Sequence, residues 1–389
     1  MFVLGYGSSG KAAEALGREL GFEVKVFDGE MEVVGDADFA VVSPGLPMTS
    51  PLVVGCRRRG IPLVSEMQFG CEELKRRGWR LVAITGSKGK SSVVKLVADA
   101  LGGVACGNYG LPVSEVALRA CKDGLVSTAV VEVSSFMMET TRLPGDFFDA
   151  AAVLNLQEDH LDRHGSVAAY HALKLKLLDF ARVRVSPVSA DEAASAEVSG
   201  IVRGSYFDNE ILRTNAACAI RLMQSAGLDD ASIAAAFRRF GPLPHRFELV
   251  EEIDGVRYVD DSKATSVAAL IAGVTMAAEG ASVPRVRLIA GGLAKGDDPA
   301  MATPYLTEWV KKVYIIGCCA EKFFAAWFGS VDCEVSGTLE RAVESSMRDA
   351  CSGDCVLLSP GCASFDQFKS FGERGDRFVD FVKKGKKKR

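Results

Sequence analysis

Residues 81–92, with the sequence LVAITGSKGKSS, constrain the fold more than any other stretch of the chain. An apolar, β-branched run leads into a loop of glycines and lysines, and a helical pattern then begins at Ser91. The N–H groups of such a loop and the dipole of the following helix attract an anion, so the stretch predicts a phosphate site. Lys90 would contact the terminal phosphates, and the Ser91 hydroxyl would bind Mg²⁺. The spacing is not that of a Walker A motif, because Ile84 stands where that motif has its first glycine; an ordinary glycine-rich turn is the alternative.

The composition limits the class of protein. A chain of 389 residues is long enough for about two or three domains. Its net charge of −4 gives no general attraction to nucleic acid or to an anionic membrane. The first residues do not resemble a signal peptide, and no run of about 18 apolar residues occurs. The eleven cysteines are scattered and form no zinc motif. We therefore expect a cytoplasmic enzyme with reduced, buried thiols that binds no nucleic acid and does not insert stably into a membrane.

Residues 1–79 alternate between short strand and helix patterns, which is typical of a parallel, doubly wound α/β sheet. The sequence from Gly5 to Gly10 is a G-x-G-x-x-G turn between a strand and a helix, and Asp28 lies at the end of the next strand. This pattern is the dinucleotide fingerprint, so a nicotinamide oxidoreductase is one hypothesis. The same turn also suits any other pyrophosphate at a helix N-terminus.

Residues 80–240 contain further polar side chains at predicted strand ends. Glu132 ends the strand pattern of 128–133, and His160 follows the strand pattern of 148–156. Because the carboxyl ends of parallel strands meet at one edge, we expect Glu132 and His160 near Lys90 and Ser91, as ligands for Mg²⁺ beside a phosphate. An amphipathic helix is predicted over 170–180, with Lys174 and Lys176 on a solvated face.

Two further expectations concern the rest of this region. Residues 181–210 show no clear pattern and suggest a shortened subdomain or a surface connection. A helix is predicted over 215–224 with Asn215 at its start, and the sequence GPLPH at 241–245 is typical of a boundary between domains.

Residues 245–389 again alternate, and four predicted strands end in glycine, lysine, threonine or serine. Such ends bring cationic and hydroxyl donors to one sheet edge, which favours a site for carboxylates or phosphates. Ordinary turn chemistry at each end is the alternative. The last residues, 383–389 (KKGKKKR), are expected to form a solvated tail, with a weak contact to anionic lipid as the alternative.

Eight motifs in a fixed order resemble the Mur ligase family. They are TGSKGKSS at 85–92, GNYGLP at 107–112, EVSSF at 132–136, LNLQEDHLDRH at 154–164, HRFE at 245–248, DDSKATS at 260–266, GGLAKGDD at 291–298 and SPGCASFDQFKSFGERG at 359–375. The resemblance covers nearly the whole chain, and the short ATP loop of that family accounts for the imperfect Walker spacing.

The resemblance implies three domains: a Rossmann-like domain for the UDP-substrate (1–79), a central P-loop-type ATPase domain with a parallel sheet (80–240) and a Rossmann-like domain for the amino acid (241–389). The implied activity is ATP-dependent ligation through an acyl phosphate, with ATP and two Mg²⁺ ions, in cytoplasmic synthesis of peptidoglycan precursors. The motifs at 260–266 and 359–368 favour D-glutamate as the amino acid and UDP-N-acetylmuramoyl-L-alanine as its acceptor, and the protein is expected to be a monomer.

The resemblance also implies residue roles, taken over by motif position. The ATP site would comprise Gly86, Gly89, Lys90, Ser91, Ser92, Asn215, Arg246 and Asp261. The metal-site residues would be Ser91, Glu132, His160 and Lys174, with Lys174 carbamylated, and the catalytic set would be Lys90, His160 and Lys174. The UDP-sugar would contact Gly5, Gly7, Ser43, Gly45, Asn108 and Ser134. D-Glutamate would contact Lys263, Thr265, Lys295, Ser364 and Phe371.

Two alternatives remain at this stage. One is a Mur or folylpolyglutamate-type ligase that uses a different amino acid. The other is a nicotinamide oxidoreductase built on the turn from Gly5 to Gly10. An assay with several amino acids distinguishes the first, and a test of NAD binding distinguishes the second.

Overall fold

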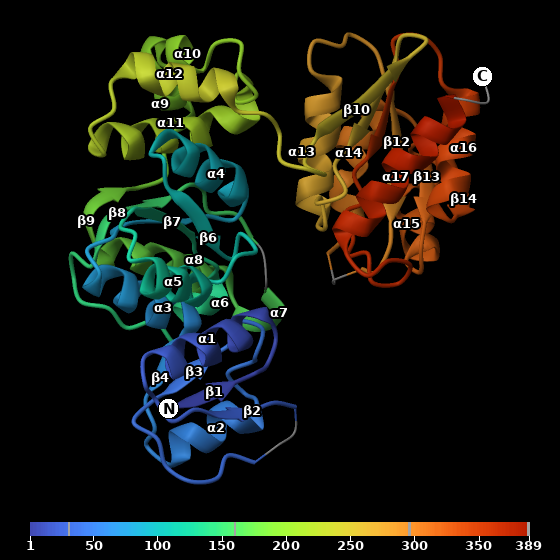
Figure 1. The fold of residues 1–389 in the computed structure, drawn as a ribbon. Coiled ribbons are helices and arrows are strands. Elements are labelled where there is room, and N and C mark those ends of the chain that lie inside the picture. Colours follow the sequence, from blue (N-terminus) through green and yellow to red (C-terminus); the bar gives the residue numbers. More distant parts are fainter. Residues whose placement is uncertain (30–31, 159–160, 295–296, 387–389) are drawn as a thin grey trace. The chain divides into compact units, whose positions relative to one another are not determined.

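The computed structural model describes residues 1–389 except 30–31, 159–160, 295–296 and 387–389. It divides into two compact units, Met1–Phe240 and Gly241–Arg389. The first unit holds two separate parallel sheets and the second holds one larger sheet (Figure 1). The predicted α/β class with parallel sheets is confirmed, whereas the division into three domains at 79/80 and 240/241 stays a prediction.

The first sheet has the strand order β2-β1-β3-β4, all parallel. Its central strand β1 is completely buried, and one face of the sheet packs against α2 through Phe2, Leu4 and Leu52. The elements of this part are β1 (Phe2–Leu4), α1 (Ser8–Glu19), β2 (Lys25–Phe27), β3 (Ala40–Val42), α2 (Pro51–Arg58), β4 (Leu63–Ser65) and α3 (Glu66–Arg76).

The second sheet has the order β6-β7-β5-β8-β9, also parallel. Its strands are β5 (Arg80–Thr85), β6 (Val104–Gly107), β7 (Thr128–Glu132), β8 (Phe148–Val153) and β9 (Ala181–Val185). Its helices are α4 (Lys90–Ala100), α5 (Val113–Asp123), α6 (Ser135–Met138), α7 (Leu161–His164), α8 (Val167–Leu175), the 3₁₀ turn η1 (Lys176–Phe180), α9 (Ala190–Ala193), α10 (Ala196–Val202), α11 (Glu210–Ser225) and α12 (Asp230–Arg239).

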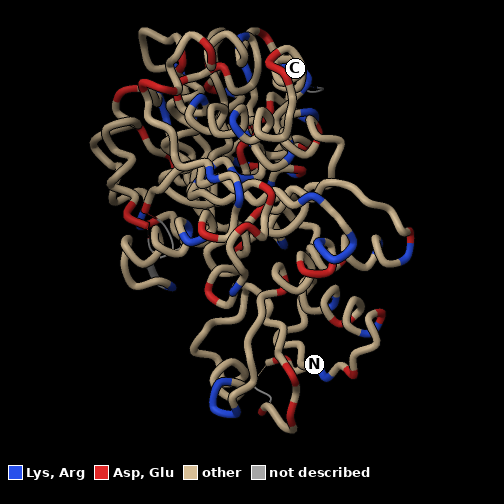
Figure 2. Tube along the Cα trace, turned by 90° about the vertical axis from the view of Figure 1, so that its left-hand side faces the viewer, with Lys and Arg blue, Asp and Glu red and all other residues tan. Residues whose placement is uncertain are grey.

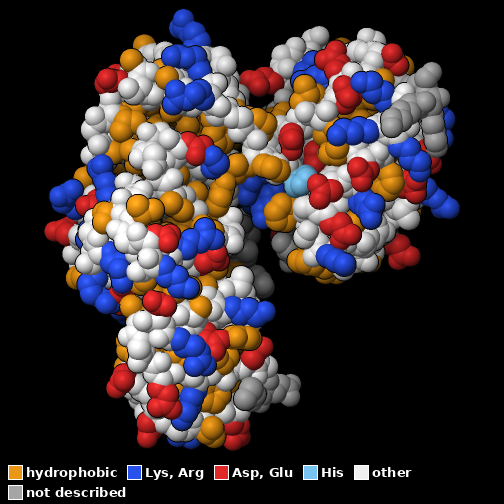
Figure 3. All heavy atoms as spheres, in the orientation of Figure 1, with side chains coloured by type: hydrophobic (Ala, Val, Ile, Leu, Met, Phe, Trp, Pro, Cys, Tyr) orange, Lys and Arg blue, Asp and Glu red, His pale blue; other side chains and the backbone are white. Residues whose placement is uncertain are grey.

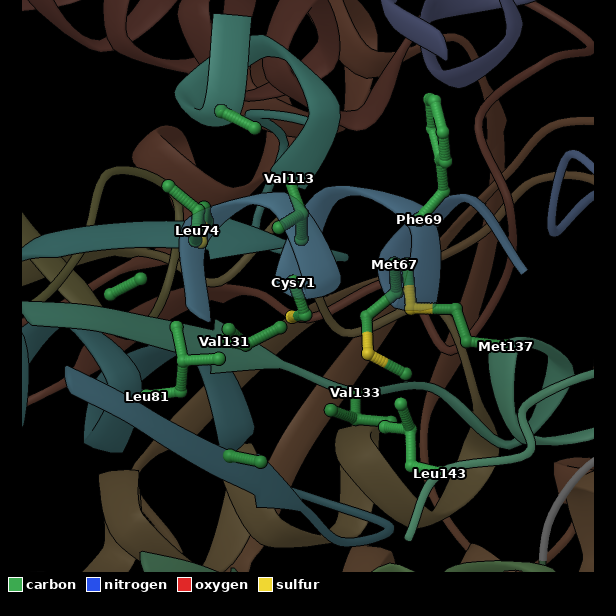
Figure 4. Close-up of a cluster of buried hydrophobic side chains, with 14 of the residues drawn as sticks. Met67, Phe69, Cys71, Leu74, Leu81, Val113, Val131, Val133, Met137 and Leu143 are labelled. Carbon is green, nitrogen blue, oxygen red and sulfur yellow. The ribbon is translucent and has the colours of Figure 1, made fainter. Parts of the chain in front are cut away.

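Strand β5 is central in this sheet and is buried on both faces. Successive side chains alternate between faces, so Leu81 and Ala83 join one core while Val82 and Ile84 join another. The first core also contains residues of the N-terminal sheet, such as Val3, and residues of α3 and α5. This shared core packs the two sheets of the unit against each other. Figure 4 shows part of it, with residues of α3, β5, α5 and β7 converging.

The second unit is built on a six-stranded sheet of order β10-β11-β15-β12-β13-β14, in which only the edge strand β10 is antiparallel. Its strands are β10 (Glu248–Ile253), β11 (Val256–Asp260), β12 (Val286–Gly291), β13 (Val310–Ile316), β14 (Cys333–Gly337) and β15 (Cys355–Leu358). Its helices are α13 (Val267–Ala278), η2 (Pro299–Ala302), α14 (Thr303–Trp309), α15 (Ala320–Trp327), α16 (Leu339–Asp349) and α17 (Phe371–Lys386). Apolar cores lie on both faces of this sheet.

The structure differs from the expected start of one helix, and it adds detail at residues 181–210 and at the C-terminus. Residues 181–210 contain the edge strand β9 and two short helices, α9 and α10, whose apolar residues include the buried Val198 and Val202. Helix α11 begins at Glu210 rather than at Asn215, because the Asn209 side chain caps it by accepting a hydrogen bond from the Leu212 N–H at 2.9 Å. The basic C-terminal segment is helical as far as Lys386, in α17, and the three residues beyond lie outside the described part.

The surface carries charges of both signs. Lysines and arginines alternate with aspartates and glutamates along the trace (Figure 2), and the face drawn in Figure 3 shows the same mixture on each unit. Among the described residues, no helix has the length and apolar character needed to cross a bilayer. All eleven cysteines are free thiols, and seven of them are buried as expected, whereas Cys318 and Cys351 are exposed.

Candidate active site

The predicted phosphate loop leaves the carboxyl end of β5 and turns into α4, as the sequence predicts. Gly89 caps the helix with a φ of +77°, in the left-handed region that favours glycine. A Cβ atom there would also lie 2.1 Å from Nδ2 of Asn215. The position therefore requires glycine for two reasons, its backbone angle and the closeness of Asn215.

The loop is held in shape by Asn155, which follows β8. Its Oδ1 accepts hydrogen bonds from the N–H groups of Ser87 (3.1 Å) and Lys88 (2.9 Å). Its Nδ2 donates to the Lys88 carbonyl (2.9 Å) and to Oδ1 of Asn215 (2.8 Å). The sequence analysis gave Asn155 no role, because the strand predicted over 148–156 included it, whereas β8 ends at Val153. Asn215 is thus placed at the loop, as the resemblance implies.

Two lysines meet at the Gly86 carbonyl. Nζ of Lys90 donates to it at 2.9 Å and to the Ser87 carbonyl at 3.2 Å. Nζ of Lys174, from α8, donates to the same Gly86 oxygen at 2.9 Å, and its side chain is only 1 % exposed. A solvated face for Lys174, as the helical pattern predicts, is therefore wrong, whereas the closeness to the loop fits the role implied by the resemblance.

The solvated reading of Lys176 was also wrong. Its side chain is half-buried, donates to the Thr141 carbonyl at 3.1 Å and lies over the Phe180 ring. Burial lowers the pKa of this lysine. The α8 helix ends at Leu175 and tightens into the 3₁₀ turn η1, so the regular amphipathic pattern assumed over 170–180 does not continue through Lys176.

Glu132 ends β7 beside the loop and is 2 % exposed. Its Oε2 accepts a hydrogen bond from the Ser91 hydroxyl at 2.5 Å, and its Oε1 accepts one from Nδ2 of Asn108 at 2.7 Å. The two side chains that donate to Glu132 within the described part of the chain, Ser91 and Asn108, are both neutral. A buried carboxylate next to a serine hydroxyl is a donor set that suits Mg²⁺.

An aromatic stack supports Lys174 from the side. The ring of His164 stacks on Tyr170 with centroids 5.5 Å apart, and Lys174 lies over the Tyr170 ring, 4.6 Å from its centroid. Nε2 of His164 is 3.0 Å from the Ser135 hydroxyl. Sequence reasoning did not single out these residues, because nothing in a short helical pattern says which ring lies under which amine.

The described residues contain no group of three or more histidine, cysteine, aspartate and glutamate side chains that could hold a metal ion. The predicted ligand His160 lies outside the described residues, so its place near Glu132 stays a prediction.

A cavity of about 430 Å³ opens between the loops of the two sheets in the first unit. It is lined by five of the six residues predicted to contact the UDP-sugar, namely Gly5, Gly7, Ser43, Gly45 and Asn108. Ser134 is not among the lining residues; its hydroxyl caps α6 by accepting from the Met137 N–H. Because Asn108 also donates to Glu132, the cavity and the phosphate loop share a hydrogen-bonded boundary.

The glycine turn at this cavity is tightly built. A Cβ atom at Gly10 would lie 2.0 Å from the Gly5 carbonyl oxygen, and the Ser43 hydroxyl donates to that same oxygen at 2.9 Å. The turn therefore needs glycine to close the strand against α1, with Gly7 at the N-terminal cap of that helix. In this chain the G-x-G-x-x-G turn forms part of the wall of the cavity.

The second unit brings predicted strand ends together, as its parallel order requires. Asp261, just beyond β11, accepts hydrogen bonds from the Phe247 N–H (3.2 Å) and the Ser359 hydroxyl (2.9 Å), which lies just beyond β15. Burial raises the pKa of Asp261 to about 7. Lys263 lies over the Phe371 ring, with its Nζ 4.0 Å from the centroid.

Arg374 anchors this edge of the sheet and was missed by the sequence analysis. It is 1 % exposed, and its guanidinium donates to the Ser262 hydroxyl and carbonyl at 2.9 and 2.8 Å and to the Cys362 carbonyl at 3.2 Å. Burial lowers the pKa of Arg374 to about 10. The Arg374 clamp therefore joins the loop that carries Lys263 and Thr265 to the loop that carries Ser364.

The remaining predicted residues divide by unit. Ser364 is buried near the Arg374 clamp, and Lys295 lies outside the described residues. Arg246 and Asp261 belong to the second unit, whereas Lys90 and Asn215 belong to the first. A single ATP site formed from both sets stays a prediction.

The Mur ligase middle domain matches residues 84–206, and the Mur ligase, glutamate ligase domain matches residues 245–362. The chain is 31% identical to the UDP-N-acetylmuramoylalanine--D-glutamate ligase of Chlamydia caviae over 98% of this chain and 97% of that relative. It is 35% identical to the ligase of the same name from Hahella chejuensis, over 88% of this chain and 83% of that relative.

Solved structures share the fold at low sequence identity. The UDP-N-acetylmuramate-alanine ligase MurC of Thermotoga maritima matches with a TM-score of 0.60 and 16% identity, over 99% of both chains. E. coli FolC, in complex with DHPP and ADP, matches with a TM-score of 0.55 and 15% identity, over 81% of this chain and 93% of that one. With two domain matches and full-length relatives above 30% identity, the chain belongs to the Mur ligase family.

Proposed function

We propose that this chain uses ATP to join D-glutamate to UDP-N-acetylmuramoyl-L-alanine in the synthesis of peptidoglycan precursors. The full-length relatives that carry this name support the proposal. The single structural observation that carries it is the meeting of Lys90 and Lys174 at the Gly86 carbonyl, at the N-terminus of α4. The Lys90 amine and a helix N-terminus at one loop suit the phosphates of a nucleotide, and the same contact places Lys174 where its carbamate could hold a metal ion beside them.

The residues beside the loop fit magnesium. Ser91 and Glu132 supply a hydroxyl and a carboxylate within hydrogen-bonding distance of each other, and the Glu132 carboxylate is buried. If Mg²⁺ took the place of the Ser91 hydroxyl proton beside Glu132, the buried carboxylate would be paired with a cation instead of a neutral hydroxyl. When bound, Mg²⁺ would screen the phosphate charges. We propose that His160 and a carbamylated Lys174 complete two such sites.

Carbamylation of Lys174 is compatible with its contacts. The modification replaces an ammonium cation by an anion but leaves one N–H on Nζ. That N–H can still donate to the Gly86 carbonyl, now 2.9 Å from Nζ. The Tyr170 ring, stacked on His164, restricts where the side chain can go.

The proposed reaction has two steps. The L-alanine carboxylate of the acceptor attacks the γ-phosphate of ATP, which releases ADP and forms an acyl phosphate. The amine of D-glutamate then attacks the acyl carbon, and a tetrahedral intermediate collapses to an amide and inorganic phosphate. Lys90 and the loop N–H groups would stabilise the charge that develops on the transferred phosphoryl group, and the protein mainly orients the three substrates.

The other substrates are assigned by position. The cavity lined by Gly5, Ser43 and Asn108 would hold the UDP-sugar, next to the loop through Glu132. The edge of the second sheet would hold D-glutamate through the proposed contacts Lys263, Thr265, Lys295, Ser364 and Phe371. We propose a monomeric enzyme that works in the cytoplasm, where ATP and the UDP-sugar are available.

Phosphate release with each substrate omitted in turn tests the function. We expect release only when ATP, Mg²⁺, UDP-N-acetylmuramoyl-L-alanine and D-glutamate are all present, and a product whose mass equals the acceptor plus glutamate minus water. Parallel reactions with L-glutamate, L-lysine and meso-diaminopimelate define the amino acid. Turnover with one of these in place of D-glutamate would replace the assigned substrate, and NAD binding at the Gly5 turn would contradict the assignment of the cavity.

A further inference from the structure

Two buried thiols face each other at the carboxyl edge of the second sheet. Sγ of Cys319 and Sγ of Cys362 are 3.5 Å apart. Cys319 caps the N-terminus of α15, and Cys362 lies in the loop that follows β15. The two residues are 6 % and 1 % exposed. The sequence shows no motif that pairs them, because they are 43 positions apart.

The backbones on both sides of the pair are held in place. The Cys319 N–H donates to the Gly292 carbonyl at 3.1 Å, and a Cβ atom at Gly292 would lie 3.2 Å from Cβ of Cys362. Both terminal nitrogens of Arg374 donate to the Cys362 carbonyl at 3.2 Å. The thiols therefore stay next to each other without a covalent bond between them.

The exposed neighbour Cys318 is turned elsewhere. Its thiol donates to the Gly292 carbonyl at 3.3 Å, and its N–H donates to the Asp366 carboxylate at 3.0 Å. A disulfide needs sulfur atoms about 2.05 Å apart, so Cys319 and Cys362 have to approach by about 1.5 Å. Rotation of the two side chains can supply part of this movement, and a shift of the segment around Cys362 would supply the rest.

We infer that Cys319 and Cys362 form a reversible disulfide when the protein meets a peroxide. In the first step the Cys319 thiolate attacks one oxygen of hydrogen peroxide, the O–O bond breaks, and a sulfenic acid and hydroxide form. In the second step the sulfur of Cys362 attacks the Cys319 sulfur, and its proton leaves with the sulfenic hydroxyl as water. Two thiols are oxidised to one disulfide, and one peroxide is reduced to two waters.

The environment favours Cys319 as the first thiol to react. The hydrogen bond between the thiols lowers the pKa of Cys319, because Cys362 retains its proton. The N-terminus of α15 also favours a thiolate at its cap. A small oxidant suits a pair with so little exposed surface, and a reversible disulfide in an enzyme of the cytoplasm is usually a redox-sensing one.

The crosslink would act on the predicted amino-acid site, and this consequence rests on the proposed function. Cys362 lies two residues before Ser364, a proposed D-glutamate contact, and Asp366 of the same segment accepts from the Cys318 N–H. A bond to Cys319 would therefore pull on the segment that carries Ser364. We expect a severalfold higher KM for D-glutamate and an unchanged KM for ATP in the oxidised protein.

Mass spectrometry of the peroxide-treated full-length protein tests the crosslink by itself. We expect loss of two hydrogen atoms and a non-reduced peptide pair that joins Cys319 to Cys362, both reversed by dithiothreitol. The loss should disappear in Cys319→Ser and in Cys362→Ser, and should persist in Cys351→Ser, which removes an exposed thiol elsewhere in this unit. A peptide pair that contains Cys318 instead, or no loss of hydrogen in the wild-type chain, would overturn the inference.

Kinetics of the same samples separate the two proposals. If the crosslink forms and D-glutamate ligation is absent in both redox states, the proposed function fails and the disulfide stands. If ligation occurs and no crosslink forms, only the disulfide fails. Should Cys362→Ser unfold, Cys319→Ser alone decides, because Cys319 is less deeply buried than Cys362. A crosslink that leaves the KM for D-glutamate unchanged contradicts the effect assigned to Ser364.

Discussion

The amine of Lys174 donates a hydrogen bond to the carbonyl of Gly86 at 2.9 Å, although the two residues are 88 positions apart. This contact holds α8 against the loop that follows β5, the central strand of the second sheet. Lys90 donates to the same oxygen, so one carbonyl orients two amines.

Substitution Lys174→Ala should inactivate the enzyme, because the proposed carbamate and its contact with the loop are both lost. Short carboxylates added to the assay should restore part of the activity by occupying the space of the carbamate. Lys176→Ala is the matched control, since Lys176 is near in sequence but donates to Thr141 instead of the loop. Phosphate release measures all three, and full activity of Lys174→Ala without added carboxylate would remove the carbamate role.

Substitution Lys90→Ala should lower the ligation rate by on the order of 10²–10³, the usual cost of losing one charge contact to a transition state. Binding of the UDP-substrate should be unaffected, because Lys90 does not line that cavity. Lys95→Ala serves as the control, since Lys95 lies on the same helix and pairs with Asp99 away from the loop. Single-turnover assays and titration calorimetry give the two quantities, and near-normal turnover would contradict the phosphate-loop assignment.

Substitution Gly89→Ala should weaken ATP binding at least about tenfold, because roughly 1–2 kcal/mol of backbone strain would displace the loop from the conformation that binds phosphate. A further cost arises because the new Cβ would lie 2.1 Å from the Asn215 amide. Gly102→Ala is a precise comparison: Gly102 also has a positive φ, of 60°, but open space surrounds its Cβ position. Calorimetric titration with a non-hydrolysable ATP analogue should show a loss for Gly89→Ala only. Equal affinities in the two variants would mean that Asn215 does not restrict the loop.

Glu66 should make the first unit less stable as the pH rises. Burial raises the pKa of Glu66 from 4.5 to about 7, although the Ser114 N–H donates to its carboxyl at 2.7 Å. Between these pH values the folded protein holds a proton that the unfolded chain has lost, so the free energy of unfolding falls as the pH increases through the window. The full loss, reached above the folded pKa, is on the order of 3 kcal/mol.

The substitution Glu66→Gln removes this titration and keeps an oxygen for the Ser114 N–H. The difference in free energy of unfolding between the variant and the wild type should therefore grow in favour of the variant from pH 5 to pH 8. The contribution of Asp261 to the pH dependence cancels in this difference, because its raised pKa is common to both proteins. Urea unfolding at several pH values measures it, and a difference that does not change with pH would show that Glu66 titrates normally.

The sequence predicted well whatever depends on local pattern. Strands such as β5 and β7 end where apolar runs give way to glycine or charge, and the parallel order then brings Ser91 and Glu132 together. The start of α11 was misplaced because asparagine is a common N-cap and both Asn209 and Asn215 were available. Only the structure shows that the Asn209 side chain accepts the hydrogen bond from the Leu212 N–H. Lys174 was misread for a related reason. A helical pattern gives the face of a residue, but not what covers that face.

Contacts between segments far apart in the sequence could not be predicted from the periodicity of apolar and polar residues. Asn155, Arg374 and the pair of Cys319 and Cys362 each join segments that no periodicity links. The apolar residues of 181–210 are spread over three short elements, each below the length at which a period can be recognised. His160 and Lys295 lie outside the described residues, and their roles stay predictions.

The four hydrogen bonds of Asn155 have a thermodynamic consequence for nucleotide binding. Ordering a flexible backbone costs about 1–2 kcal/mol per residue, and a loop that must fold around its ligand loses that much affinity. Here the amide of one side chain fixes the backbone at Ser87 and Lys88 through contacts within the protein itself. Binding free energy is then left for the phosphates themselves, and product departure requires no unfolding of the loop.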